Sequence, residues 1–299
     1  MIVKNEAHCI SRAIDSLSIM SPRYICLLDT GSTDDTIGVA RAAAKKQGAC
    51  LVARETEWHG FGRARTEALA LSRSVAPCAW HLMIDADEEV TSCDIGEIAC
   101  MCGCMDDVAY NVTVNLGTLT FPRTSLLGSS PGIRYQGRIH EYPVVNRVDG
   151  LAPVTILSHG DGARSKSEHT RRHDYDLALL DYSDAPNART SYYLGQCAEL
   201  AGEVDVAIAS YLGSIQLGCN TDTVARCALA VARLTTNKDM AQSALDMALW
   251  AWPGRAEPLC ALAAWADIHG LRGMSKWALA ARPICPPVGA QWVDWSAYQ

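Results

Sequence analysis

The chain has 299 residues, 49% of them hydrophobic and 20% charged, and its formal net charge is -7. This composition is typical of a soluble protein with a sizeable core and enough length for two domains. The acidic balance argues against broad binding to a nucleic-acid backbone. No run of about 18 apolar residues occurs, so we expect no membrane-spanning helix.

The first part of the chain alternates between apolar runs and amphipathic segments. The runs at 25–32, 49–54 and 79–85 have the character of buried strands, whereas 32–48 and 62–75 have helical spacing. Alternation of this kind predicts an α/β domain whose parallel sheet is covered by helices on both faces. In such sheets ligands bind at the carboxyl ends of the strands.

The third apolar run leads into an unusually acidic stretch, "HLMIDADEEV". If 85–87 continue the strand, Asp85 and Asp87 point to one side and Ala86 turns away, because side chains alternate along a strand. Two convergent carboxylates favour a hard divalent cation, Mn²⁺ or Mg²⁺. The plainer interpretation is a strand that ends in a solvated acidic loop.

The character of the chain changes twice after this stretch. Residues 108 to 160 are rich in β-formers and predict several strands, and the chain then becomes helical and rich in alanine and leucine. We therefore expect a first domain at 1–163, a polar connector at 164–186 and a helical domain at 187–299.

The helical half shows a weak internal repeat. Gly195 and Tyr211 fall at the small and large positions of a 34-residue helix-turn-helix unit of the tetratricopeptide type, and Ala244, Ala248 and Pro253 fit a second copy. An ordinary helical bundle is the alternative. Arrays of this type present concave surfaces, so we expect this domain to dock an acceptor or to form a homodimer.

Thirteen cysteines occur, and no secretion signal is recognisable, so we expect reduced thiols and a cytoplasmic protein. The densest group contains no CxxC pair, which favours small packing or exposed thiols over a metal centre. Its members are Cys93, Cys100, Cys102 and Cys104.

Several motifs occur in a characteristic order along residues 1–165. They are "IVKNE" at 2–6, "LLDTGSTDDT" at 27–36, "WHGFGRART" at 58–66, "LMIDADE" at 82–88, "RYQGRIHEYP" at 134–143 and "LSHGDG" at 157–162. As an ordered set they resemble family 2 glycosyltransferases, and within them the subgroup with tetratricopeptide-like helices behind the catalytic domain. The resemblance implies a GT-A, Rossmann-like mixed sheet flanked by helices, followed by an all-α TPR-like domain.

This chain departs from the family pattern at three places. Gly60 and Thr66 stand where the family usually has Asp and Asn. Met1 falls within the first expected strand, where the family usually has several more residues.

The resemblance also implies the residues of a donor site. Asp85 would contact the ribose or share the metal, and Asp87 and His159 would bind the metal directly. The full set expected to bind the nucleotide-sugar is Lys4, Asn5, Glu6, Asp29, Arg65, Asp85, Ala86, Asp87 and Arg138. Each also has a plain structural interpretation, such as a turn-capping aspartate for Asp29 or a solvated helix arginine for Arg65.

The reaction implied is inverting transfer of a sugar from a nucleoside diphosphate, with a UDP-sugar as the expected donor, to an acceptor hydroxyl. Such a transfer needs a general base, for which Glu141 is the candidate, with His140 contacting acceptor or phosphate. Arg123 and Arg138 are candidates to line the cleft. The acceptor could be a protein, a glycan, a lipid-linked sugar or a modified nucleobase. The alternative to an enzyme is a non-catalytic helical-repeat protein with a decayed transferase domain.

Overall fold

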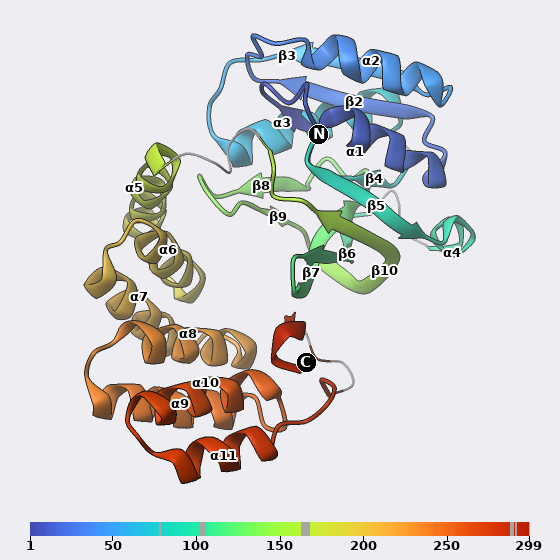
Figure 1. The fold of residues 1–299 in the computed structure, drawn as a ribbon. Coiled ribbons are helices and arrows are strands. Elements are labelled where there is room, and N and C mark those ends of the chain that lie inside the picture. Colours follow the sequence, from blue (N-terminus) through green and yellow to red (C-terminus); the bar gives the residue numbers. More distant parts are fainter. Residues whose placement is uncertain (78, 102–105, 163–167, 288–289, 291, 299) are drawn as a thin grey trace. The chain divides into compact units, whose positions relative to one another are not determined.

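A computed structural model of the chain describes residues 1–77, 79–101, 106–162, 168–287, 290 and 292–298. The chain divides into two compact units, Met1–Ser167 and Glu168–Gln299 (Figure 1). The first unit is α/β and the second is helical, so the expected fold class is confirmed.

A parallel sheet forms the start of the first unit. Its strands lie in the order β1 (Ile2–Val3), β2 (Tyr24–Asp29), β3 (Cys50–Glu55). Beside this sheet lie the helices α1 (Ile10–Ser16), α2 (Thr36–Lys46) and α3 (Phe61–Val75) and the 3-10 turn η1 (Leu17–Met20). Helix α2 begins four residues after the expected start at position 32.

Side chains of β2 alternate between two hydrophobic clusters. Ile25 and Leu27 pack with residues of α1 and α2, whereas Leu28 packs with Ala68 and Leu69 of α3. This alternation follows from the two-residue period of a strand. It places helices on both faces of the sheet, as the sequence predicts.

A mixed sheet follows, with strands in the order β7-β6-β10-β5. Strand β10 (Arg147–Ser158) is parallel to β6 (Val108–Leu116) and antiparallel to β5 (Glu88–Cys93). Strand β7 (Leu119–Leu127) forms a hairpin with β6. The other elements are α4 (Ile95–Cys100) and the hairpin of β8 (Arg134–Gln136) and β9 (Tyr142–Val144).

The apolar run at 79–85 forms a shorter strand than expected. Only β4 (His81–Leu82) is a strand, and it pairs antiparallel with β7. Residues 83–87 leave the ladder and form a turn in which the Glu88 N–H donates to the Asp85 carbonyl, 3.3 Å. Asp85 and Asp87 therefore lie in a turn rather than on a strand, and the expected strand alternation does not apply to them.

The second unit begins earlier than expected, because α5 (Glu168–Asp184) occupies most of the stretch interpreted as a connector. Its sequence is so polar that it shows little of the apolar periodicity that would predict a helix. Figure 1 shows the helices that follow as successive hairpins. Their bounds are α6 (Ala188–Leu200), α7 (Val204–Gln216), α8 (Thr221–Leu234), α9 (Lys238–Ala251), α10 (Ala256–Ile268) and α11 (Arg272–Ala280), with the short β11 (Val293–Asp294) and η2 (Trp295–Tyr298) after them.

None of the helices in the described ranges is long and apolar enough to cross a bilayer. The cysteines that the structure describes are free thiols; Cys93 is half-buried and Cys100 is exposed. Cys102 and Cys104, the other members of the expected cluster, lie outside the described residues.

The small and large positions of the first expected repeat meet in the structure. A Cβ added at Gly195 of α6 would lie 2.8 Å from a ring carbon of Tyr211. That ring is 2% exposed and its hydroxyl donates to Glu199, 2.9 Å, so it has little freedom to move away.

We therefore expect Gly195→Ala to lower the free energy of unfolding by about 1–3 kcal/mol, because overpacking forces backbone shifts. Gly273→Ala is the matched control, since Gly273 also lies in a helix but a Cβ there would meet nothing within 4 Å. This control should raise stability by up to about 1 kcal/mol through helix propensity. Urea unfolding of the two variants tests the contrast, and equal effects would contradict it.

Candidate active site

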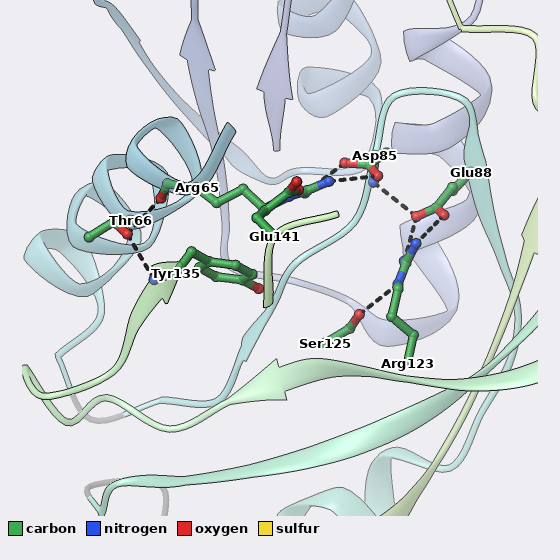
Figure 2. Close-up of polar contacts among 9 residues, drawn as sticks. Arg65, Thr66, Asp85, Glu88, Arg123, Ser125, Tyr135 and Glu141 are labelled. Atoms are coloured by element: carbon green, nitrogen blue, oxygen red, sulfur yellow. Dashed lines mark hydrogen bonds and ion pairs between the residues drawn. The ribbon is translucent and has the colours of Figure 1, made fainter. Parts of the chain in front are cut away.

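An ion-pair cluster lies where α3, the turn after β4 and the segment before β9 meet (Figure 2). The Arg65 guanidinium donates to both Asp85 carboxylate oxygens, at 2.8 and 3.0 Å. Its Nε donates to the Glu141 carboxylate. One cation thus joins two of the carboxylates that the sequence indicates, although the residues are 20 and 76 positions away from it in the chain.

Local features of α3 allow this approach. A Cβ at Gly62 would lie 2.6 Å from the Gly137 carbonyl oxygen, so only glycine lets the chain before Glu141 come this close to the helix. Thr66 Oγ donates to the Gly62 carbonyl, 2.8 Å, and accepts the Tyr135 N–H, 2.9 Å. Thr66 therefore anchors β8 to α3, which gives this departure from the family pattern a structural role.

The charges in this cluster stabilise one another. Burial works against the charged form of Asp85, but the ion pair with Arg65 outweighs it and lowers the pKa of Asp85 well below its usual range. Burial also works against the charge of Arg65, yet Asp85 and Glu141 raise the pKa of its guanidinium. The side chains are 15% exposed for Arg65, 30% for Asp85 and 10% for Glu141, so the cluster borders solvent rather than lying deep in the core.

A second ion pair adjoins the first, and the sequence did not point to it. Arg123 on β7 donates to both carboxylate oxygens of Glu88, at 2.6 and 2.7 Å, and Glu88 Oε2 accepts the Asp85 N–H, 3.0 Å. The signal for Glu88 was weak, because it is one of several adjacent acids and the only clue was its place at the start of a strand. Arg123 was expected in the cleft, but without this partner.

Asp87 lies on the other side of the same turn. Gly162 donates its N–H to Asp87 Oδ2, 3.2 Å, and the His159 N–H donates to the Asp87 carbonyl, 3.1 Å. His159 Nε2 lies 3.0 Å from Glu89 Oε2. Asp161 beside them is held by Arg12 through two hydrogen bonds, 2.6 and 3.0 Å, which lower the pKa of the Asp161 carboxyl.

The expected metal ligands do not converge in this structure. Within the described ranges, Asp85, Asp87 and His159 do not form a group whose ligand atoms lie within 4.8 Å of one another; Glu6, His8 and Cys9 do. Both oxygens of Asp85 are taken by Arg65, whereas the carboxylate of half-buried Asp87 accepts only the Gly162 N–H in the described contacts. Asp87 therefore fits a divalent cation, which often takes one or two protein carboxylates and fills its other positions with phosphate and water.

The remaining donor-site candidates lie at the carboxyl edge of the parallel sheet. Asp29 is 4% exposed, and its Oδ1 accepts from the N–H groups of Gly31 and Ser32 and from the Ser32 hydroxyl. Asp29 thus caps its turn, which agrees with the alternative interpretation of Asp29 as a turn-capping aspartate. Asn5 Oδ1 accepts the Thr33 N–H, 2.7 Å, which ties the loop after β1 to the loop after β2.

The other residues of the expected set differ in their surroundings. Glu6 N–H donates to Thr36 Oγ, 2.8 Å, and Lys4 is exposed. Ala86 packs into the hydrophobic cluster around α1. Arg138 and His140 are exposed in the segment between β8 and β9, where His140 has a positive φ of 50°, uncommon outside glycine.

Comparisons with known proteins find similarity in the first part of the chain. The model for Glycosyl transferase family 2 matches residues 1–99, which hold Asp29, Arg65, Asp85 and Asp87. The succinoglycan biosynthesis protein ExoU of Rhizobium meliloti (strain 1021) is 42% identical over 72 residues. That match spans 24% of this chain and 21% of the relative's length.

Two solved structures are distantly similar. S. aureus TarS 1-349 in complex with UDP-GlcNAc has a TM-score of 0.39 and 13% identity, with 90% of each chain covered. S. aureus TarS has a TM-score of 0.37 and 13% identity over 92% of this chain and 54% of that one. The family match over residues 1–99 confirms the resemblance carried by the sequence motifs that lie in that region, which is about the first third of the chain.

Proposed function

We propose that the protein is an inverting glycosyltransferase that moves a sugar from a nucleoside-diphosphate sugar, a UDP-sugar by preference, to an acceptor hydroxyl. The observation that carries the proposal is the junction of Arg65, Asp85 and Glu141 within a domain whose first 99 residues match family 2. A guanidinium and carboxylates at the edge of a sheet suit a ligand that carries both phosphate and hydroxyl groups.

Each residue has a defined task in this proposal. Asp87 would hold Mn²⁺ or Mg²⁺, which would supply positive charge to the departing diphosphate. Arg65 lies beside Asp85 and orients it toward the nucleoside. Asp29, Asn5 and Glu6 border the nucleotide at the strand ends.

Glu141 accepts the proton of the acceptor hydroxyl in this proposal. Its side chain is 10% exposed and its carboxylate is held by Arg65 Nε, so its orientation is set before any acceptor arrives. The acceptor class stays open between protein, glycan, lipid-linked sugar and modified nucleobase. The helical unit is proposed to dock the acceptor or to mediate self-association.

Loss of the proposed metal ligand tests the function. We expect wild-type protein to turn over at least one member of a panel of UDP- and GDP-sugars with Mn²⁺ or Mg²⁺, and to lose that turnover in chelator. Asp87→Asn should reduce it by at least about tenfold, because the cation loses its charged protein ligand. Asp94→Asn is the matched control, since among the described contacts the Asp94 carboxylate accepts the Glu97 N–H and caps α4. Turnover unchanged in Asp87→Asn would reject the metal role, and absence of turnover across the panel would favour the non-catalytic alternative.

A further inference from the structure

Glu88 and Arg123 form a partly buried ion pair that several hydrogen bonds hold in place. Arg123 makes two hydrogen bonds to Glu88, and its Nε donates to Ser125 Oγ, 2.9 Å. The Glu88 side chain is 3% exposed and the Arg123 side chain 31%. Burial works against the charge of Arg123, yet Glu88 raises the pKa of the guanidinium, so Arg123 stays charged.

Glu88 also closes the turn that carries the site aspartates. Its carboxylate accepts the Asp85 N–H at 3.0 Å, and its own N–H donates to the Asp85 carbonyl at 3.3 Å. The other side of the turn is fixed through Asp87, which bonds to the backbone of His159 and Gly162. Two separate segments, β7 and the residues that follow β10, thus hold this four-residue turn; Figure 2 shows the side formed by Arg123, Glu88 and Asp85.

Stability alone is a weak reason for such an arrangement. A buried ion pair often contributes no more to folding than well-packed apolar residues of the same volume, since desolvation offsets the attraction. Apolar residues at these positions would, however, leave the Asp85 N–H without its acceptor and free the turn to change shape. The charged pair keeps an acceptor for the Asp85 N–H and so fixes the direction of the Asp85 backbone.

We propose that Glu88 and Arg123 are positioning residues of the donor site. Held by Arg123, the Glu88 carboxylate fixes the turn so that Asp85 meets Arg65 while Asp87 stays open to the metal-bound diphosphate. Neither side chain needs to touch the donor for this role. The inference rests on the proposed function, and it adds a pair of residues that act through Asp85 and Asp87.

The test uses the full chain and two readouts. In Glu88→Gln an amide oxygen can still accept the Asp85 N–H, but the neutral side chain can no longer hold both arms of Arg123. We expect the KM for the donor found in the panel, and the Mn²⁺ concentration for half-activation, each to rise about tenfold, with a smaller change in kcat. Calorimetric titration of UDP with Mn²⁺ should show the same loss of affinity without any turnover.

A matched control separates positioning from general destabilisation. Arg73→Gln also removes a partly buried arginine from the first unit, where Arg73 donates to the carbonyls of Ile133 and Gly128. It should lower thermal stability while leaving KM and UDP affinity at wild-type values. If Glu88→Gln does not fold, Arg123→Lys and Ser125→Ala serve instead, with smaller shifts in the same direction.

Several outcomes would overturn the inference. Wild-type KM and UDP affinity in Glu88→Gln, or losses equal to those of Arg73→Gln at matched stability, would reduce the pair to a structural role. Additive effects of Glu88→Gln and Arg123→Gln in the double variant would also overturn it, because residues that act as one unit must be non-additive. A wild-type protein that binds UDP with Mn²⁺ but transfers no sugar would instead count against the proposed function and leave the positioning role supported through the binding readout.

Discussion

Replacing Glu141 with glutamine is expected to reduce kcat by about 10²–10⁴, the usual contribution of a general base. The amide keeps the shape of the side chain but cannot accept the proton of an acceptor hydroxyl. Donor KM should change little, since Arg65 retains its two hydrogen bonds to Asp85. Steady-state kinetics with the donor and acceptor pair identified for the wild type provide the measurement.

Glu67→Gln is the matched control for this variant. Glu67 is also a carboxylate paired with an arginine of α3, at 2.9 Å from Arg63 Nε, but it lies outside the cluster. Its kcat should equal that of the wild type. A Glu141→Gln enzyme whose kcat stays within about tenfold of wild type would remove Glu141 from the role of base, and His140, exposed nearby in the chain, would become the next residue to test.

The second large effect concerns stability. Arg65→Gln leaves the carboxylates of Asp85 and Glu141 close together without their shared cation. Removing one partner of a fully buried ion pair costs about 3–5 kcal/mol, and since this cluster borders solvent we expect the lower end of that range. We expect a loss of that order in the free energy of unfolding, measured by urea titration at neutral pH.

Arg63 offers a close control, two residues away on the same helix. Its side chain is 62% exposed and pairs with Glu67 four residues on. Exposed pairs of this spacing contribute about 0.3–0.5 kcal/mol, so Arg63→Gln should be nearly neutral. Equal losses in the two variants would mean that the Arg65 cluster contributes no more than an exposed salt bridge.

The same ion pair predicts the response to acid. The pKa of Asp85 is lower in the folded than in the unfolded chain, so its contribution is fully present above the ordinary carboxyl value of about 3.9 and is lost as pH falls through the lowered folded value. Wild-type stability should therefore decline on the acid side. Asp85→Asn should be less stable at neutral pH and should show a flatter decline there.

Local patterns in the sequence were enough for two strands of the first sheet and the helices beside it, but the run at 79–85, expected as a further parallel strand, pairs antiparallel in the second sheet. Apolar runs and helical spacing predicted β2, β3 and α3, because burial of one face imposes a period that is visible in the residues themselves. The same reasoning failed for α5, whose polar surface carries little periodic signal, and for the strand before Asp85. That strand ends early because the turn at Asp85 is set by Glu88 and by the distant loop after β10.

By itself, the sequence predicted the α/β and helical halves of the chain and the family resemblance that the match over residues 1–99 confirms. Only the tertiary structure decided the partners of the charged residues: Arg65 between Asp85 and Glu141, Arg123 on Glu88, and Asp87 beside Gly162. The reason is physical. Helix and strand patterns depend on neighbours within a few positions, whereas an ion pair depends on which elements meet in space, and these partners lie 20 to 76 residues apart in the chain.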